Sequence, residues 1–156
     1  MDAIVAGTLA YFSESHPLDG YPPHRCPAPE WEPDPLGSFS SGITPYLTLN
    51  CNESPDGQCG AIDETGGPFK PGEYAAVIWT DNPIWVLVGF AKLTPHAFHY
   101  ALNVNNEPDE YGRCSFTASA YADFDDDIVF STYELRGTVD QDGPVLEPLF
   151  IDKPCE

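Results

Sequence analysis

The sequence predicts an α+β domain in which one N-terminal helix precedes four to six antiparallel strands with long loops between them. Two patterns carry this prediction. Residues 2–15 place apolar side chains at helical spacing, and residues 113–135 contain two extended runs on either side of a short acidic segment. The length of 156 residues is typical of a single domain, so we expect 1–156 to form one unit.

The first predicted element is the helix of residues 2–15. Val5, Leu9 and Phe12 recur at i, i+4 and i+7, and Pro17 ends the helical pattern. Because Asp2 is almost the first residue, no helix-capping residue precedes it. This is consistent with a helix that continues upstream in the native gene, and a short terminal helix packed on a sheet fits the same residues.

An expanded loop region is predicted over residues 17–80. Eight prolines fall between Pro17 and Pro45, interspersed with aromatic side chains, which is typical of an irregular loop anchored by its aromatic residues. Short strands are expected within this region at 46–50 and 74–80.

The antiparallel sheet is predicted over residues 84–135. Segment 84–90 is apolar on all sides and fits a buried strand or a short helix, whereas 98–104 alternates as a strand does. From 115 to 122 the alternation is strict, with Phe116 and three alanines on one face and Ser115, Thr117, Ser119 and Tyr121 on the other. A second run, 128–135, completes a hairpin, and 137–156 is expected to be a C-terminal tail packed down by its apolar residues: Val145, Leu149, Phe150 and Ile151.

The hairpin tip is a candidate cation site formed by Asp123, Asp125 and Asp127. Their spacing matches the first oxygen ligands of an EF-hand loop, but that loop needs Gly where Ile128 stands. The segments on either side are also predicted to be strands, whereas an EF-hand loop lies between helices. We therefore exclude an EF-hand. A simpler Ca²⁺ site and a solvated acidic turn both remain open.

The amino-acid composition and the absence of catalytic motifs limit the classes of function to be expected. The chain has 25 acidic and 6 basic residues, a net charge of −19, which disfavours nucleic acid and anionic membranes as partners and favours cations and basic protein surfaces. We find no catalytic sequence motif such as a P-loop, GxSxG or HExxH, and therefore expect a non-enzymatic protein.

The five cysteines favour an oxidising compartment. Cys51 and Cys59 bracket a polar turn that a disulfide could close. We favour a second bridge between Cys114 and Cys155, which would pin the tail to the sheet, and this leaves Cys26 over. The sequence does not prove any of these pairings.

The order of several short motifs resembles the globular domains of type IV pilins and pilin-like proteins, particularly those of myxobacteria and related delta-proteobacteria. These motifs are AYFSE at the end of the first helix, YPP in the loop, PIWVLVGF from Pro83, the aromatic strand at 98–100, SFTA at 115–118, the acidic turn, FSTY at 130–133 and a C-terminal Cys. The resemblance covers residues 3–21 and 83–135.

The resemblance implies a structural subunit of a type IV pilus or related filament, with a helix packed on a four-stranded antiparallel sheet. It implies that the helix of 2–15 continues a longer apolar helix, the only contact with the membrane before assembly, and that Val5, Leu9 and Phe12 pack against other subunits in an extracellular filament. The long acidic loops suggest a minor or specialised pilin that exposes them for adhesion or partner contacts. Some relatives bind Ca²⁺ in an acidic loop, and many close a C-terminal loop with a disulfide. The alternatives are a pseudopilin of a type II secretion system and a secreted, cation-dependent binding module.

Overall fold

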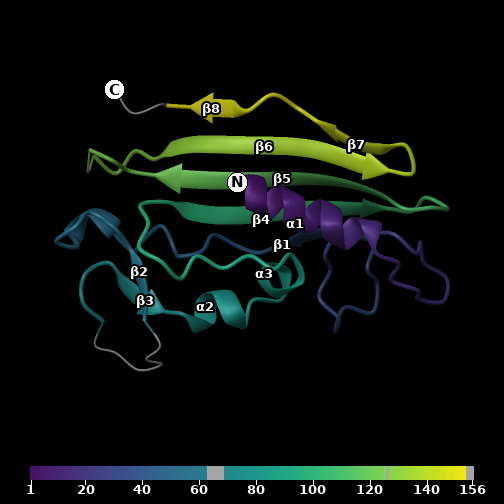
Figure 1. Ribbon diagram of the computed structural model, residues 1–156, viewed down its shortest axis with the longest axis horizontal. Coiled ribbons are helices and arrows are strands. Elements are labelled where there is room, and N and C mark those ends of the chain that lie inside the picture. Colours follow the sequence, from purple (N-terminus) through teal and green to yellow (C-terminus); the bar gives the residue numbers. More distant parts are fainter. Residues whose placement is uncertain (63–68, 126, 154–156) are drawn as a thin grey trace.

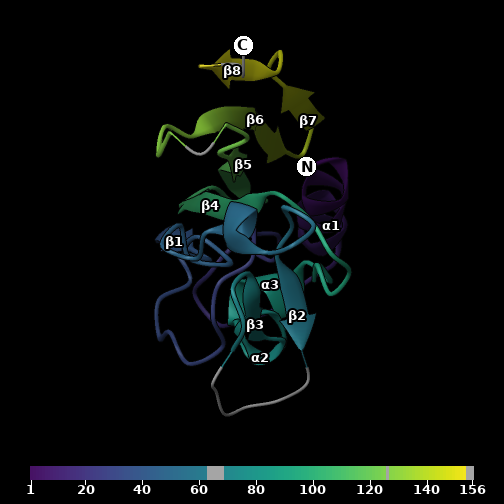
Figure 2. The ribbon, with the colours of Figure 1, turned by 90° about the vertical axis from the view of Figure 1, so that its left-hand side faces the viewer.

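The computed structural model describes residues 1–62, 69–125 and 127–153. It is an α+β structure in which helix α1 (Asp2–Ser13) lies across one face of a six-stranded sheet, as Figures 1 and 2 show from two directions. The spatial order of the strands is β1 (Gly37–Ser40), β4 (His99–Glu107), β5 (Arg113–Ala122), β6 (Ser131–Asp140) and β7 (Gly143–Leu146), and β8 (Phe150–Asp152) also pairs with β6. Every pairing in this sheet is antiparallel. The predicted α+β class with an antiparallel sheet is confirmed.

The smaller elements gather beyond β4. They are the 3-10 helix η1 (Cys51–Glu53), the parallel pair β2 (Gly60–Ile62) and β3 (Glu73–Ala75), and the short helices α2 (Val77–Thr80) and α3 (Pro83–Leu87). In Figure 2 α2, α3, β2 and β3 lie below β4, while α1 covers the sheet from one side.

The core forms where α1, α2 and α3 meet the covered face of the sheet. Strand β5 turns Phe116, Ala118 and Ala120 into this core, and the register places Leu102 of β4 opposite Ala118. Trp79 from α2 and Trp85 from α3 are almost fully buried beside them. The apolar phase of the 115–122 alternation therefore faces the core, as the period of two predicts.

Helix α1 packs closely because of one glycine. A Cβ atom at Gly7 would lie 2.1 Å from the backbone oxygen of Val88, the residue that follows α3. Only glycine lets the two backbones approach this closely. The helix buries four side chains: Ile4, Val5, Thr8 and Phe12.

Two predicted strands are corrected by the structure. Residues 74–80 form a strand only as far as Ala75 and then enter α2. The apolar segment at 84–90, for which a buried strand and a short helix were both open, forms the helix α3. The physical reason for α3 is its capping: the Asn82 side-chain oxygen accepts hydrogen bonds from the backbone N–H groups of Ile84 and Trp85, and Pro83 fits the first helical turn. The expected strand at 46–50 is a turn, and β1 in the proline-rich region was not predicted.

Over the residues that the structure describes, 137–153, the expected tail at 137–156 is mostly sheet. Strand β6 continues to Asp140, and β7 and β8 add strands beyond it. The apolar side chains that we expected to pack the tail down are instead exposed, with Val145 at 66% and Phe150 at 48% of their full accessible surface. The described part of the chain has nothing that covers β7 and β8 as α1 covers β5.

The disulfides correct one predicted pairing. The Cys51–Cys59 bridge that the sequence suggested is present. Cys114 pairs with Cys26, so the predicted Cys114–Cys155 bridge is wrong, and Cys155 itself lies outside the described residues. The reason is the path of the proline-rich loop: the buried side chain of Asn106 in β4 accepts from the Cys26 N–H and donates to the Cys26 oxygen, which places Cys26 against the start of β5.

Candidate functional site

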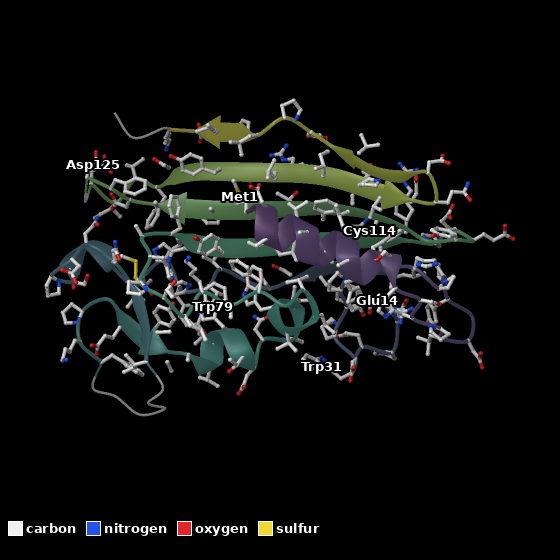
Figure 3. The ribbon with its side chains drawn as sticks, in the orientation of Figure 1. Met1, Glu14, Trp31, Trp79, Cys114 and Asp125 are labelled. Atoms are coloured by element: carbon white, nitrogen blue, oxygen red, sulfur yellow. A yellow bond between two sulfur atoms is a disulfide. The ribbon has the colours of Figure 1, made fainter. Side chains whose placement is uncertain are left out.

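The acidic hairpin tip brings the three predicted ligands together. Ala122 of β5 and Ser131 of β6 are the last paired residues, and the chain between them forms the tip, where Asp125 lies at one end of the molecule (Figure 3). One carboxylate oxygen from each of Asp123, Asp125 and Asp127 lies within 4.8 Å of the others. Asp123 is half-buried and the other two are exposed. Three converging carboxylates are a donor set that suits a hard cation.

Two of these carboxylates also hold the turn. Asp123 accepts a hydrogen bond from the Ile128 N–H at 3.0 Å, and Asp127 accepts one from the Val129 N–H at 2.7 Å. Ile128 has φ +70°, the left-handed conformation that favours glycine, and its side chain is 84% exposed. A β-branched residue rarely adopts this conformation. The carboxylates thus stabilise a strained turn, a structural role that they would have with or without a cation.

The tip is also tied to the disulfide loop. Asn52 of η1 donates its side-chain N–H to the Asp123 backbone oxygen at 2.7 Å. Beneath this contact lies a cavity of about 200 Å³ whose lining includes Asp123, Ile128, Cys51 and His99. His99 contacts the Pro45 backbone oxygen through Nδ1 at 2.9 Å, and burial lowers the pKa of its imidazole.

Counted from Asp123, Ser131 and Glu134 stand at the ninth and twelfth positions of the EF-hand spacing, but their side chains have other partners. The Ser131 hydroxyl donates to the Lys153 backbone oxygen at 2.6 Å, and Glu134 pairs with Arg136. Neither belongs to the group of carboxylates at the tip. The exclusion of an EF-hand agrees with this geometry.

A second polar cluster lies in the core around His96. The Tyr74 hydroxyl lies 2.8 Å from His96 Nε2, donates to the Lys92 backbone oxygen and accepts from Trp79 Nε1. His96 is only 5% exposed, and burial lowers its pKa to about 4, so its imidazole is neutral at physiological pH. Tyr74 is buried as well, and burial raises the pKa of its hydroxyl. These hydrogen bonds connect β3, α2 and the segment that precedes β4.

The face of the sheet opposite α1 is buried at one end, around His99, Ala101 and Ser119. Its remaining part, the uncovered face, carries a hollow that the sequence analysis did not identify. It has a volume of about 380 Å³ and lies over β1, β4, β5 and β6. Its polar lining includes Ser38, Asn103, Ser115 and Thr117. The available signal was the polar phase of the 115–122 alternation, which places Ser115 and Thr117 on one face of the strand.

Two of the three predicted filament-packing residues, Val5 and Phe12, are corrected, whereas a contact of Leu9 with another subunit stays a prediction. Val5 and Phe12 are 5% and 3% exposed because they pack into the core of this chain, and Leu9 packs against the same core while remaining partly exposed. Side chains that fill their own core are not available to a neighbouring subunit. The outward face of α1 consists instead of Asp2, Ala3, Ala6, Ala10 and Ser13.

No family profile, curated protein or solved structure matches this chain. Among the described residues, no helix combines the length and the apolar character that crossing a membrane requires. The pilin resemblance therefore rests on the sequence motifs alone.

Proposed function

We propose that this protein is a non-enzymatic structural subunit of a type IV pilus or related filament, and that α1 packs against helices of other subunits through its outward face. One observation carries the proposal. The outward face of α1 is composed of small side chains, Ala3, Ala6, Ala10 and Ser13, and Asp2 is the one charged residue of the helix.

This face is unusual for a helix in contact with water. A surface helix normally presents charged or polar side chains opposite its buried stripe. One residue in five of the whole chain is charged, yet eleven of the twelve residues of α1 are not. Small side chains also let a second helix approach closely, as Gly7 already does for the segment after α3. Both properties favour coverage of α1 by another helix.

The acidic surface would then lie on the outside of the filament. In such a filament the loops of 17–80 and the hairpin tip would face outwards, where adhesion or contact with basic partners would occur. Subunits with a net charge of −19 repel one another, so bound cations or basic neighbours would be needed to stabilise the assembly. A minor or specialised subunit, surrounded by other subunits, meets this requirement more easily than a filament built of this chain alone.

The test replaces Ala6 by Glu in the full-length gene product in its native cell. Ala6 is exposed at the middle of the outward face, so the isolated domain should lose no more than about 0.5 kcal/mol of stability. The matched control is Ala91→Glu, at an exposed position outside the helices and strands. We expect wild-type and Ala91→Glu protein in filaments sheared from the cell surface, and Ala6→Glu protein in the membrane fraction only.

Two results would overturn the proposal. Normal assembly of Ala6→Glu would show that the outward face is not a helix-packing surface. Absence of the wild-type protein from every sheared fraction, with release of the chain into the medium, would favour a secreted binding module instead.

A further inference from the structure

The hollow on the uncovered sheet face has an ordered arrangement of side chains. The strand register aligns Ser40, Asn103, Thr117 and Arg136 in one row across β1, β4, β5 and β6. The adjacent row on the same face consists of Ser38, Asn105, Ser115 and Thr138. Seven of these eight side chains are hydroxyls or amides, and all eight residues line the hollow.

The chemistry of these rows suits a ligand rich in hydroxyl groups. Hydroxyls and amides each donate and accept hydrogen bonds, so a row of them can satisfy the mixed donors and acceptors of a sugar. The Ser38 hydroxyl already donates to the Asn105 side-chain oxygen at 3.0 Å, which orients the Asn105 amide. Side chains on neighbouring strands are roughly 4.8 Å apart, a spacing comparable to the length of one sugar ring, and a row of four therefore presents partners to successive rings.

The charge of the hollow favours a neutral ligand. Between β1 and β5 the rows carry no charge, although the whole chain carries −19. The hollow is also lined by the carboxylate of Glu147, directly after β7, which adds to the repulsion of an anionic ligand. At the β6 end the Arg136 guanidinium pairs with Glu134 and lies 5.5 Å from the centre of the Phe150 ring, so its charge is compensated within the protein. The surrounding carboxylates repel anionic ligands.

From this arrangement we infer that the uncovered sheet face binds a neutral oligosaccharide that runs across the strands. The side chains of the rows form hydrogen bonds with its hydroxyl groups. Beyond the β6 end of the rows, the exposed side chains of Val145 in β7 and Phe150 in β8 lie on the same face and offer apolar contacts. The inference does not depend on the proposed filament role, because a free domain and a filament subunit present this face equally.

The test titrates the ¹⁵N-labelled protein with a panel of neutral oligosaccharides that includes cellohexaose, maltohexaose and hexa-N-acetylchitohexaose. An anionic oligogalacturonate of equal length is the charge control. We expect at least one neutral member at millimolar concentration to shift the backbone amide signals of residues 38–40, 103–105 and 115–117 saturably, and the anionic member to leave them unchanged.

Two substitutions test whether binding depends on the hollow or on the rest of the same sheet face. Thr117→Ala removes a hydroxyl from the hollow, and loss of about 1 kcal/mol of hydrogen bonding should weaken binding roughly fivefold. Thr132→Ala, on the same face of β6 but outside the hollow, should bind like the wild type. The inference fails if no neutral member shifts these amides, if the shifts map to another surface, if the anionic member binds as tightly, or if both variants bind equally.

Discussion

Protonation of one buried histidine, His96, should lower the stability of the protein in mild acid. His96 is 5% exposed and lies against the rings of Tyr74, Trp79 and Tyr100. Burial lowers its pKa from 6.5 to about 4, with nearby Lys92 and His99 acting in the same direction. The folded protein therefore binds this proton less tightly than the unfolded chain does.

The sign and size follow from proton linkage. For a base whose pKa is lowered by folding, the contribution to stability is complete above pH 6.5 and is lost as the pH falls from 6.5 towards 4. With these two values the loss is about 2 kcal/mol at pH 5 and about 3 kcal/mol at pH 4. At roughly 2–4 °C per kcal/mol for a chain of this length, the melting temperature should fall by about 4–8 °C at pH 5.

The assay is urea unfolding followed by tryptophan fluorescence between pH 7.5 and 5, on the wild type and on His96→Gln. Glutamine keeps an amide N–H for the Tyr74 hydroxyl and does not titrate. The many carboxylates also titrate at the acid end, but they do so in both proteins, so the difference between the two isolates His96. That difference should shrink by about 2 kcal/mol between pH 7.5 and 5.

The control is Thr132→Ala, which removes a partly exposed hydroxyl and changes no titratable group. Its difference in stability from the wild type should remain constant over this range. A constant gap between wild type and His96→Gln from pH 7.5 to 5 would refute the reasoning, because it would mean that His96 is protonated as easily in the folded state as in the unfolded one.

Three further predictions concern stability. Removing the Cys26–Cys114 bridge, which spans 88 residues, should lower the free energy of unfolding by about 4–5 kcal/mol, and removing the Cys51–Cys59 bridge, which spans 8 residues, by about 2–3 kcal/mol. Equal losses in denaturant titrations of the two double Ala variants would contradict this order. Gly7→Ala should lower the melting temperature although alanine is the better helix former by about 1 kcal/mol, since its Cβ would collide with the Val88 backbone oxygen; an unchanged or raised value would show that α1 can shift away. If the hairpin tip binds Ca²⁺, a Ca²⁺ concentration a hundredfold above the dissociation constant should add about 2.7 kcal/mol to the stability of the wild type and nothing to that of the Asp125→Asn, Asp127→Asn double variant. The Asp140→Asn, Asp142→Asn control should respond like the wild type. No calcium-dependent change in the stability of the wild type would exclude the site.

Local pattern was sufficient to predict the main antiparallel hairpin. Strict alternation at 115–122 specifies a strand and also which side chains face the core, because the side-chain period of a strand is two. The 2–15 helix was predicted for a similar reason, and Pro17 marked its end within a few residues of Ser13. The acidic tip followed from the sequence because its aspartates are neighbours along the chain.

Segments whose local pattern fits two structures were decided by their surroundings. The apolar run after Asn82 satisfies a buried strand and a short helix equally, and the cap formed by the Asn82 side chain together with burial of Trp85 selects the helix. In the same way, the helical period located Val5 and Phe12 on one face of α1 but did not say whether that face meets this chain or another one.

Contacts between distant residues belong to the tertiary structure alone. The partner of Cys114 is Cys26 because Asn106 of β4 anchors Cys26, which lies 80 residues earlier in the chain, and no local pattern encodes that approach. The hollow on the uncovered face likewise exists only once β1 pairs with β4 and places Ser38 beside Asn105. The sequence by itself determined the two strands of the main hairpin, the first helix and the acidic tip, since each depends on the spacing of near neighbours. Disulfide pairing, the direction of the α1 faces and the polar rows across the sheet depend on which elements pack together, and only the folded chain decides that.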